Sequence, residues 1–344
     1  MTLRDFLGKA RQKILLLLFG KNLYAAADRI NILENYLDEQ SRLITEQRGR
    51  IDHLSWLSSY RAQKYAPESK HPEILSDWYR DATGKNLDLN NPRTFNEKIQ
   101  WLKLYDSTLL KTRLADKFLV RDWVKEKIGE RYLVPLLGVY DNFSEINFEA
   151  LPNQFVIKAT HGSAMNLVVF DKEKLIMDQV KDNVNSFLNV NFAYKAGLEL
   201  HYRNIKPRII VEKFLKDDTE QLNDYRFVCF SGKPKYICVD TDKYINCKRN
   251  IYDLEWNLLP FTLNYPNAER ILYPPVNLKE MIDLAKRLCN GFNHVRVDLY
   301  SVNSEIYFGE MTFTSLSGIG KFTPDVWDAV WGDMITLPAI EKAK

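Results

Sequence analysis

Two acidic side chains lie in successive apolar runs near the C-terminal end of the chain. Asp298 and Glu310 flank residues 301–304, whose composition is typical of a hairpin turn. Because side chains alternate along a strand, Arg296 shares a face with Asp298, and antiparallel pairing brings Asp298 next to residues near 307–310. Adjacent carboxylates repel unless a cation compensates, and oxygen ligands favour Mg²⁺, which usually also binds substrate phosphates. The alternative is a cross-strand pair of surface carboxylates.

A lysine and a glutamate end two other apolar runs. Lys158 follows residues 155–157 and precedes the small-residue turn 161–166, so it could hold phosphate oxygens while backbone N–H groups of the turn add contacts. Glu212 and Lys213 end a later strand and could present a carboxylate and a carbonyl to adenine and ribose. A snorkelling lysine and a solvated strand end are the alternatives. The common glycine-rich phosphate-loop motifs are absent from the sequence.

Helices and strands are interleaved around these residues. Thr94, with Glu97 at the capping-box position, predicts a helix start, and residues 117–128 predict an amphipathic helix ended by Gly129. Further elements are predicted as strands 155–159 and 167–170, helix 172–190, strand 208–214, hairpin 225–239, helix 277–291 and hairpin 294–311. Because antiparallel hairpins alternate with helices without βαβ order, the predicted fold class is α+β.

The composition is that of an ordinary globular protein. Of 344 residues, 45% are hydrophobic and 27% are charged, and the net charge of +3 gives no reason to expect a nucleic acid as partner. The four cysteines are scattered and form no metal-ligand spacing, which predicts small buried thiols in the reducing cytosol. The longest apolar run, residues 14–19, is shorter than the roughly 20 residues of a membrane span, and no signal-peptide cleavage site follows it.

Residues 1–25 are basic and amphipathic. They contain five basic residues against a single acidic one, interleaved with leucine, isoleucine and phenylalanine. Such a segment can lie in a bilayer interface with its cations near anionic head groups, which predicts peripheral contact with the inner face of the plasma membrane. A helix docked on the protein's own core is the alternative.

Residues 26–60 carry a heptad pattern. Its apolar positions are Ile30, Leu33, Leu37, Ile44, Ile51 and Leu54. Gln40 and Gln47 fill the same seam, and the pattern is typical of a short coiled coil. It favours homo-oligomerisation and an intramolecular helical hairpin equally. Residues 61–75, with Pro67 and Pro72, predict a linker into the main body.

Several phrases of the sequence resemble the TupA-like branch of the ATP-grasp superfamily. They are residues 94–103, 115–117, 155–158 with 161–163, 210–212, 224–227, 295–300 and 307–312. Each phrase is weak alone, but their collinear order over about residues 75–335 is specific. The resemblance implies an ATP-grasp fold of two α+β subdomains that clasp Mg·ATP, with residues 76–216 forming a helical region and the first subdomain. Residues 217–335 would form the second subdomain with the metal site.

The resemblance also implies roles for individual residues. Lys117 and Lys158 match the lysines that hold ATP phosphates, and His161, Gly162 and Ser163 match the loop over the triphosphate. Glu212, Lys213 and Asp224 match contacts to the nucleotide. Asp298, Glu310 and Thr312 match the metal site, and Arg296 matches the cation near the transferred phosphoryl group. His161 is also a candidate base, with a turn-stabilising or substrate-binding role as the alternative. Ala164 and Met165 replace the glycine-rich part of the loop, which would stiffen it, and Thr312 stands where many ATP-grasp enzymes carry Asn.

ATP-grasp enzymes generally phosphorylate a carboxylate, which an amine then attacks. TupA-like proteins are associated with bacterial surface polysaccharides such as capsule, O-antigen and teichuronopeptide. The resemblance therefore implies a uronic-acid carboxylate on a sugar nucleotide or lipid-linked glycan, with an amino acid or amine as its partner. One alternative is a glycosyltransferase, for which residues 240–242 (Asp-Thr-Asp) would supply a metal–diphosphate site. The other is a degenerate, non-catalytic ATP-grasp scaffold.

Overall fold

The computed structural model describes residues 13–14, 21–216, 223–241 and 247–339. The chain divides into two compact units, with the boundary between Ala62 and Gln63. The helices are α2 (Lys21–Tyr65), α3 (His71–Thr83), α4 (Phe95–Tyr105), α5 (Leu109–Ala115), α6 (Val120–Lys127), α7 (Met177–Leu188), α8 (Leu278–Cys289) and α9 (Val326–Asp333). Most of the predicted basic segment 1–25 lies outside the described residues. Among the described helices, none combines the length and apolarity that a bilayer crossing requires.

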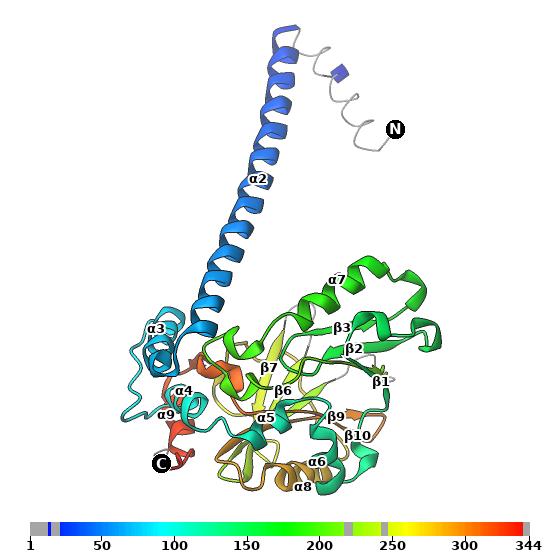
Figure 1. Cartoon of the computed structure of the whole chain (residues 1–344). Coiled ribbons are helices and arrows are strands. Elements are labelled where there is room, and N and C mark those ends of the chain that lie inside the picture. Colours follow the sequence, from blue (N-terminus) through cyan, green and yellow to red (C-terminus); the bar gives the residue numbers. More distant parts are fainter. Residues whose placement is uncertain (1–12, 15–20, 217–222, 242–246, 340–344) are drawn as a thin grey trace. The chain divides into compact units, whose positions relative to one another are not determined.

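Apart from residues 13–14, the described part of the first unit consists of helix α2, which continues to Tyr65 (Figure 1). Residues 26–60 contain no turn, so they do not form a hairpin by themselves. The described aliphatic side chains of the heptad seam are between 50% and 64% exposed, namely Leu33, Leu37, Ile44, Ile51 and Leu54. This apolar seam therefore has no cover from the described chain.

The predicted linker over 61–75 is largely helical. Helix α2 continues to Tyr65, and α3 begins at His71 with Pro72 in its first turn. Proline is favoured there because the first helical N–H groups have no intrahelical partner. The two prolines thus mark a helix boundary rather than an extended linker.

The second unit is built on two larger antiparallel sheets and a separate two-stranded sheet. Its strands are β1 (Leu136–Tyr140), β2 (Phe155–Ala159), β3 (Asn166–Val169), β4 (Ile209–Lys213), β5 (Asp224–Phe230), β6 (Lys233–Thr241), β7 (Lys248–Tyr252), β8 (Thr262–Leu263), β9 (His294–Val302), β10 (Glu305–Thr312) and β11 (Phe322–Thr323). The four-stranded sheet has the order β1-β4-β2-β3 and the five-stranded sheet the order β10-β9-β5-β6-β7, and β8 and β11 form the two-stranded sheet. The interleaved helices and antiparallel sheets confirm the α+β class.

One face of the five-stranded sheet is covered by α8, which packs on β5, β6 and β9 (Figure 1). Val295, Val297 and Leu299 on β9 are fully buried, as are Met281 and Leu288 on α8. Alternation along β9 turns the residues between these three to the other face. That other face is where the charged side chains lie.

Local sequence signals set several element boundaries. Thr94 and Glu97 form the predicted capping box at the start of α4. The predicted helix over 117–128 begins later, at Val120, because the Asp116 carboxylate accepts hydrogen bonds from the N–H groups of Phe118 and Leu119 before the helix starts. Asn303 has φ 49° and Ser304 has φ 67°, which make the tight turn between β9 and β10.

Candidate functional site

Asp298 and Glu310 face each other on β9 and β10. The turn register pairs Phe308 with Leu299, and the register then shifts so that Glu310 pairs with Asp298. Gly309 is therefore the extra residue of a β-bulge. Without this bulge, Glu310 would pair with Val297 and turn toward α8. The bulge brings the second carboxylate onto the face of the first.

A guanidinium group holds this carboxylate pair together. Arg296 donates from Nε and Nη2 to the two Asp298 oxygens, at 2.7 Å each, and from Nη2 to Glu310 Oε1 at 2.9 Å. Thr312 also donates its hydroxyl to Glu310 Oε1, at 2.9 Å. The sequence argument invoked a divalent cation to relieve the repulsion. In the structure Arg296 already provides a compensating charge.

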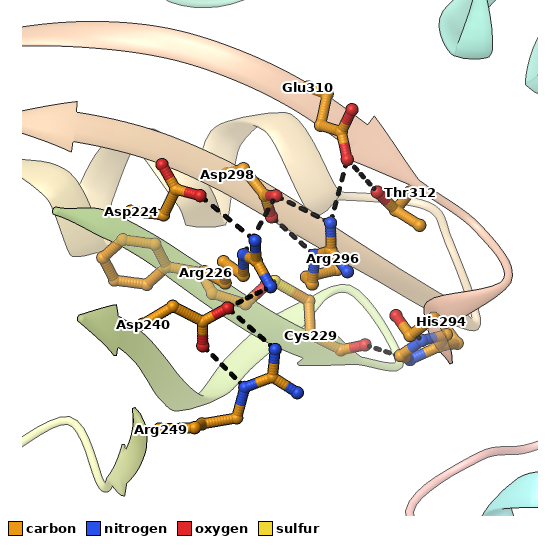
Figure 2. A network of polar contacts seen from close by, with 12 residues as sticks. Asp224, Arg226, Cys229, Asp240, Arg249, His294, Arg296, Asp298, Glu310 and Thr312 are labelled. Carbon is orange, nitrogen blue, oxygen red and sulfur yellow. Dashed lines mark hydrogen bonds and ion pairs between the residues drawn. The ribbon is translucent and has the colours of Figure 1, made fainter. Parts of the chain in front are cut away.

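The ion pairs continue across the whole five-stranded sheet, as Figure 2 shows. Arg226 on β5 lies with Nε 3.6 Å from Asp298 Oδ2 and Nη1 2.6 Å from Asp240 Oδ2 on β6. Arg249 on β7 binds both oxygens of Asp240, at 2.6 and 2.8 Å. We call this set, from Glu310 on β10 to Arg249 on β7, the charged row.

The two carboxylates have different proton affinities. Burial acts to raise the pKa of Glu310, but nearby Lys117 and Arg296 outweigh it and lower that pKa to about 2. Burial raises the pKa of Asp298 above its ordinary value, against the opposing effect of Arg296 and Arg226. Two acidic groups with separated pKa values are typical of sites that handle charge or protons.

Lys117 connects the carboxylate pair to the turn after β2. Its Nζ donates to the carbonyl of Gly162 at 2.6 Å and lies 3.6 Å from Glu310 Oε2. Its backbone N–H donates to the carbonyl of Thr160 at 3.0 Å. The segment between α5 and α6 is thus fixed against the turn, and its ammonium group lies beside Glu310.

Lys158 and Glu212 lie on neighbouring strands of the four-stranded sheet. Lys158 Nζ donates to Glu212 Oε2 at 2.7 Å, and Arg121 from α6 lies 3.3 Å from Glu212 Oε1. Burial raises the pKa of Tyr300, and the negative charges of Asp224, Glu310, Asp298 and Glu212 raise it further. Acidic groups of both sheets therefore surround the same tyrosine.

The turn that contains His161, Gly162 and Ser163 has an ordered geometry. Ala164 adopts φ 56°, a left-handed conformation that glycine would adopt more easily. His161 is buried and its Nε2 lies 3.0 Å from the carbonyl of Phe187, so the ring is oriented toward the end of α7. The structure therefore does not bring His161 into direct contact with the carboxylate pair.

The last two predicted nucleotide contacts lie at strand ends. Lys213 is exposed at the end of β4, and Asp224 is buried at the start of β5, where it accepts a hydrogen bond from Arg226 Nη2 at 3.1 Å. The structure thus gathers the predicted residues of the second subdomain on one sheet face. Of the two lysines predicted for the first subdomain, Lys117 reaches that face, where it lies beside Glu310.

A family model described as TupA-like ATPgrasp matches residues 97–336. The chain belongs to the TupA-like ATP-grasp family. This confirms the resemblance noted from the sequence and the ATP-grasp fold that it implies. No curated protein matches the chain.

Solved structures of the ATP-grasp fold are also similar to the chain. D-alanine–D-alanine ligase from Bacillus anthracis, complexed with ATP, is 14% identical with a TM-score of 0.34, over 58% of this chain and 54% of that one. L-amino acid ligase from Bacillus licheniformis is 12% identical with a TM-score of 0.36, over 57% of this chain and 42% of that one. N5-carboxyaminoimidazole synthase from Aspergillus clavatus is 11% identical with a TM-score of 0.33, over 58% and 44%. The TupA-like chain thus spans about half the length of the solved structures it matches.

Two residues of the TupA-like site, Arg226 and Arg249, escaped the sequence argument, and Asp240 entered it only as part of the glycosyltransferase alternative. Arg226, Asp240 and Arg249 join β5, β6 and β7 into the charged row. The alternation of Asp224 and Arg226 was a usable signal, because both must lie on the same face of a strand. The approach of Arg249 to Asp240 depends on the order of strands in the sheet, which one local segment does not reveal.

The sequence predicted two alternative metal sites, one at Asp298, Glu310 and Thr312 and the other at residues 240–242, and the structure can be compared with both. Asp240, from the Asp-Thr-Asp motif of the glycosyltransferase alternative, is bound by Arg226 and Arg249, and Asp242 lies outside the described residues. Within the described chain, no cluster of three or more His, Cys, Asp or Glu side chains is placed to hold a metal ion. Two carboxylates and the Thr312 hydroxyl nevertheless fit Mg²⁺, because this ion is usually bound by one or two carboxylates together with substrate phosphates.

Proposed function

We propose that the protein is an ATP- and Mg²⁺-dependent carboxylate–amine ligase. It would amidate a uronic-acid-type carboxylate during the synthesis of a capsule, O-antigen or teichuronopeptide-like surface polysaccharide. The observation that carries this proposal is the approach of Lys117 to Glu310 beside the Arg296–Asp298 pair. Membership of the TupA-like ATP-grasp family supports the reaction class.

Phosphoryl transfer depends on positioning and on neutralising negative charge. Lys117 contacts the turn after β2 and Lys158 precedes that turn, so their ammonium groups could both bind phosphate oxygens. Asp298, Glu310 and Thr312 would hold Mg²⁺, which would offset the negative charge of the phosphates. Arg296 would then be free to stabilise the transferred group, because the metal replaces it as the compensating cation of the carboxylates.

The proposed reaction has two steps. An oxygen of the acceptor carboxylate attacks the γ-phosphorus of ATP, the bond to the β-phosphate oxygen breaks, and acylphosphate and ADP form. The amine nitrogen then attacks the acyl carbon, phosphate leaves, the amine loses a proton and an amide remains. Since acylphosphates hydrolyse readily, the turn of residues 160–165 would exclude water by covering the site.

The substrates follow from the same proposal. The acid would be carried by a sugar nucleotide or a lipid-linked glycan, and the nucleophile would be an amino acid or another amine. Glycans on lipid carriers are assembled at the cytoplasmic face of the membrane, where the basic segment 1–25 could contact anionic lipids. A glycosyltransferase is less favoured, because the family match supports the ATP-grasp reaction class.

Trapping of the acylphosphate tests the proposal directly. The full chain is incubated with Mg·ATP, hydroxylamine and UDP-glucuronate or glucuronate, and both ADP and the hydroxamate are measured. Both products should appear only with the uronate present. The matched variants are Glu310→Gln and Glu305→Gln, which change carboxylates on the same strand, and only the first should abolish the products.

Three results would reject the ligase assignment. One is the absence of hydroxamate with every uronate tested. Another is full activity in Glu310→Gln. The third is sugar transfer from a UDP-sugar without ATP, which would establish the glycosyltransferase instead.

A further inference from the structure

A polar cavity of about 400 Å³ lies behind the turn that follows β2. It is lined by the segment after α7 and by the segment that leads into β4. Among the described residues, its lining includes three cations, Lys64, Arg203 and Lys206, and the amides of Asn189 and Asn204 but no carboxylate. Arg203 and Lys206 each also pair with a carboxylate outside the lining, Glu68 and Asp141. A concave site of this composition suits an anionic ligand that also carries hydroxyl groups.

His161 gives this cavity an unused polar atom. The ring is 2% exposed, and within the described residues its Nδ1 has no hydrogen-bond partner. Its Nε2 faces the carbonyl of Phe187, which only accepts, so Nε2 carries the proton. Because burial lowers the pKa of His161, the ring is neutral at pH 7 and Nδ1 is an acceptor.

Two walls of the cavity are shared with the candidate catalytic site. His161 precedes Gly162, whose carbonyl accepts the Lys117 ammonium 2.6 Å away, and that ammonium lies 3.6 Å from Glu310. Tyr202 lines the cavity, and burial together with the charges of Glu199, Glu310 and Asp298 raises its pKa. Through this turn the cavity adjoins the part of the candidate site that holds Lys117, and Tyr202 lies within electrostatic reach of Glu310 and Asp298.

We propose that this cavity binds the carboxylated sugar that is activated in the proposed reaction. Lys64, Arg203 and Lys206 attract its negative charge, and the amides of Asn189 and Asn204 pair with its hydroxyl groups. This assignment rests on the proposed function, but the binding it requires can be measured without turnover.

Lys206 provides a matched pair of variants. Lys206 and Lys174 are both exposed lysines that form an ion pair with an aspartate. Lys206 Nζ lies 2.7 Å from Asp141, and Lys174 Nζ lies 3.2 Å from Asp171. Only Lys206 of these two lines the cavity. Binding of glucuronate, glucose and glucose 6-phosphate is measured by calorimetry on the full chain, with and without Mg·AMP-PNP. Glucuronate should bind at least about tenfold more tightly than glucose, and Lys206→Glu should weaken it at least about tenfold. Lys174→Glu should bind it as the wild type does.

The results separate this assignment from the ligase assignment. Lack of glucuronate binding in both conditions, equal binding of glucose, equal effects of the two variants, or tighter binding of glucose 6-phosphate would each overturn the cavity assignment. If glucuronate binds as expected while no hydroxamate forms, the cavity assignment stands and the ligase proposal fails. If hydroxamate forms and Lys206→Glu changes nothing, the ligase stands and the cavity is not its acid site.

A second inference rests on α2 alone. We propose that α2 pairs with a second copy of itself as a parallel, in-register coiled coil. Ile44 and Ile51 occupy a positions and Leu33 and Leu54 occupy d positions, a distribution that favours two-stranded coiled coils. All four side chains are at least 50% exposed.

Polar residues of the same helix favour a second copy over a lipid surface or an apolar partner. Gln40 and Gln47 occupy d positions, so in register each amide would meet its own counterpart and exchange hydrogen bonds. If the partner were apolar, the amides of Gln40 and Gln47 would be buried without these hydrogen bonds. Arg29 at g and Glu34 at the following e position would form attractive pairs between the two helices.

The oligomeric state of the full chain tests this inference, with Ile44→Lys and Ile32→Lys as matched variants. Both isoleucines are exposed, but Ile32 lies at a c position outside the seam. Sedimentation equilibrium should give twice the chain mass for the wild type and Ile32→Lys, and the monomer mass for Ile44→Lys. Gln40→Cys should form a disulfide-linked dimer on mild oxidation, whereas Thr45→Cys at a b position should not. A wild-type monomer, equal masses for the two lysine variants, or no cross-link at Gln40→Cys would overturn it.

Discussion

The two sheets carry their charged residues in different ways. The five-stranded sheet carries the charged row, in which Asp298 and Asp240 each contact two guanidinium groups. The four-stranded sheet presents a single lysine–glutamate pair, Lys158 and Glu212, which is joined by one arginine from a helix. The first arrangement is a cross-linked network and the second is a local contact.

This difference indicates how each sheet could change when a nucleotide binds. A buried carboxylate is costly unless it is paired, and the charged row pairs its carboxylates before any metal is present. Removing one member therefore disturbs several neighbours. Lys158 can exchange one carboxylate for a phosphate oxygen with little change elsewhere, since Arg121 stays with Glu212.

Substitution of Asp298 should have the largest effect. Asp298→Asn keeps the shape of the side chain but removes a negative charge that we propose binds the metal at the centre of the charged row. We expect Mg·ATP turnover to fall by ~10³-fold, the scale of losing a major electrostatic contact to a transition state. Steady-state ADP release checks this, and circular dichroism should show an unchanged fold. Near-normal turnover would show that the carboxylate pair is not the metal site.

Lys158→Met should have a smaller and more local effect. The variant keeps the length of the side chain and leaves Glu212 paired with Arg121, so the sheet should remain intact. We expect a loss of ~10²-fold in kcat/KM for ATP, because one phosphate contact is missing. Lys174→Met is the control, because Lys174 is an exposed lysine outside the strands. Equal kinetics for the two variants would contradict a phosphate-binding role of Lys158.

The sequence predicted the chemistry of the β9–β10 hairpin better than its geometry. The apolar runs placed Asp298 and Glu310 on paired strands, but the bulge at Gly309 that aligns them arises from pairing between strands. Arg249 was missed for a related reason, since its contact with Asp240 requires β6 and β7 to be adjacent. Capping at Thr94 was predictable because it depends on residues only three positions apart. Contacts set by local spacing were therefore accessible, and those set by strand order were not.

Arg249→Lys tests whether the far end of the charged row supports the metal site. Lysine cannot bind both Asp240 oxygens in the fork geometry of arginine, so Arg226 and then Asp298 should be held less firmly. We expect the Mg²⁺ concentration for half-maximal turnover to rise about tenfold, with a smaller change in kcat. Arg113→Lys, at an exposed ion pair with Asp122, is the control. An unchanged Mg²⁺ dependence would confine the functional part of the row to β9 and β10.

The smallest predicted effect concerns stability in acid rather than turnover, and Lys117→Met tests it. The pKa of Glu310 lies at about 2, below its ordinary value of 4.5, so its ionised form stabilises the fold above pH 4.5 and that contribution is lost as the pH falls toward 2. Lys117 is the main cation that lowers this pKa, and its removal should raise the pKa and reduce the stabilisation. Acid unfolding followed by tryptophan fluorescence should therefore begin at a higher pH in Lys117→Met than in the wild type. Lys181→Met, at an exposed position of α7, should unfold as the wild type does. If both variants behave alike, Lys117 does not control Glu310, and the contact between the turn after β2 and the charged row has no energetic weight.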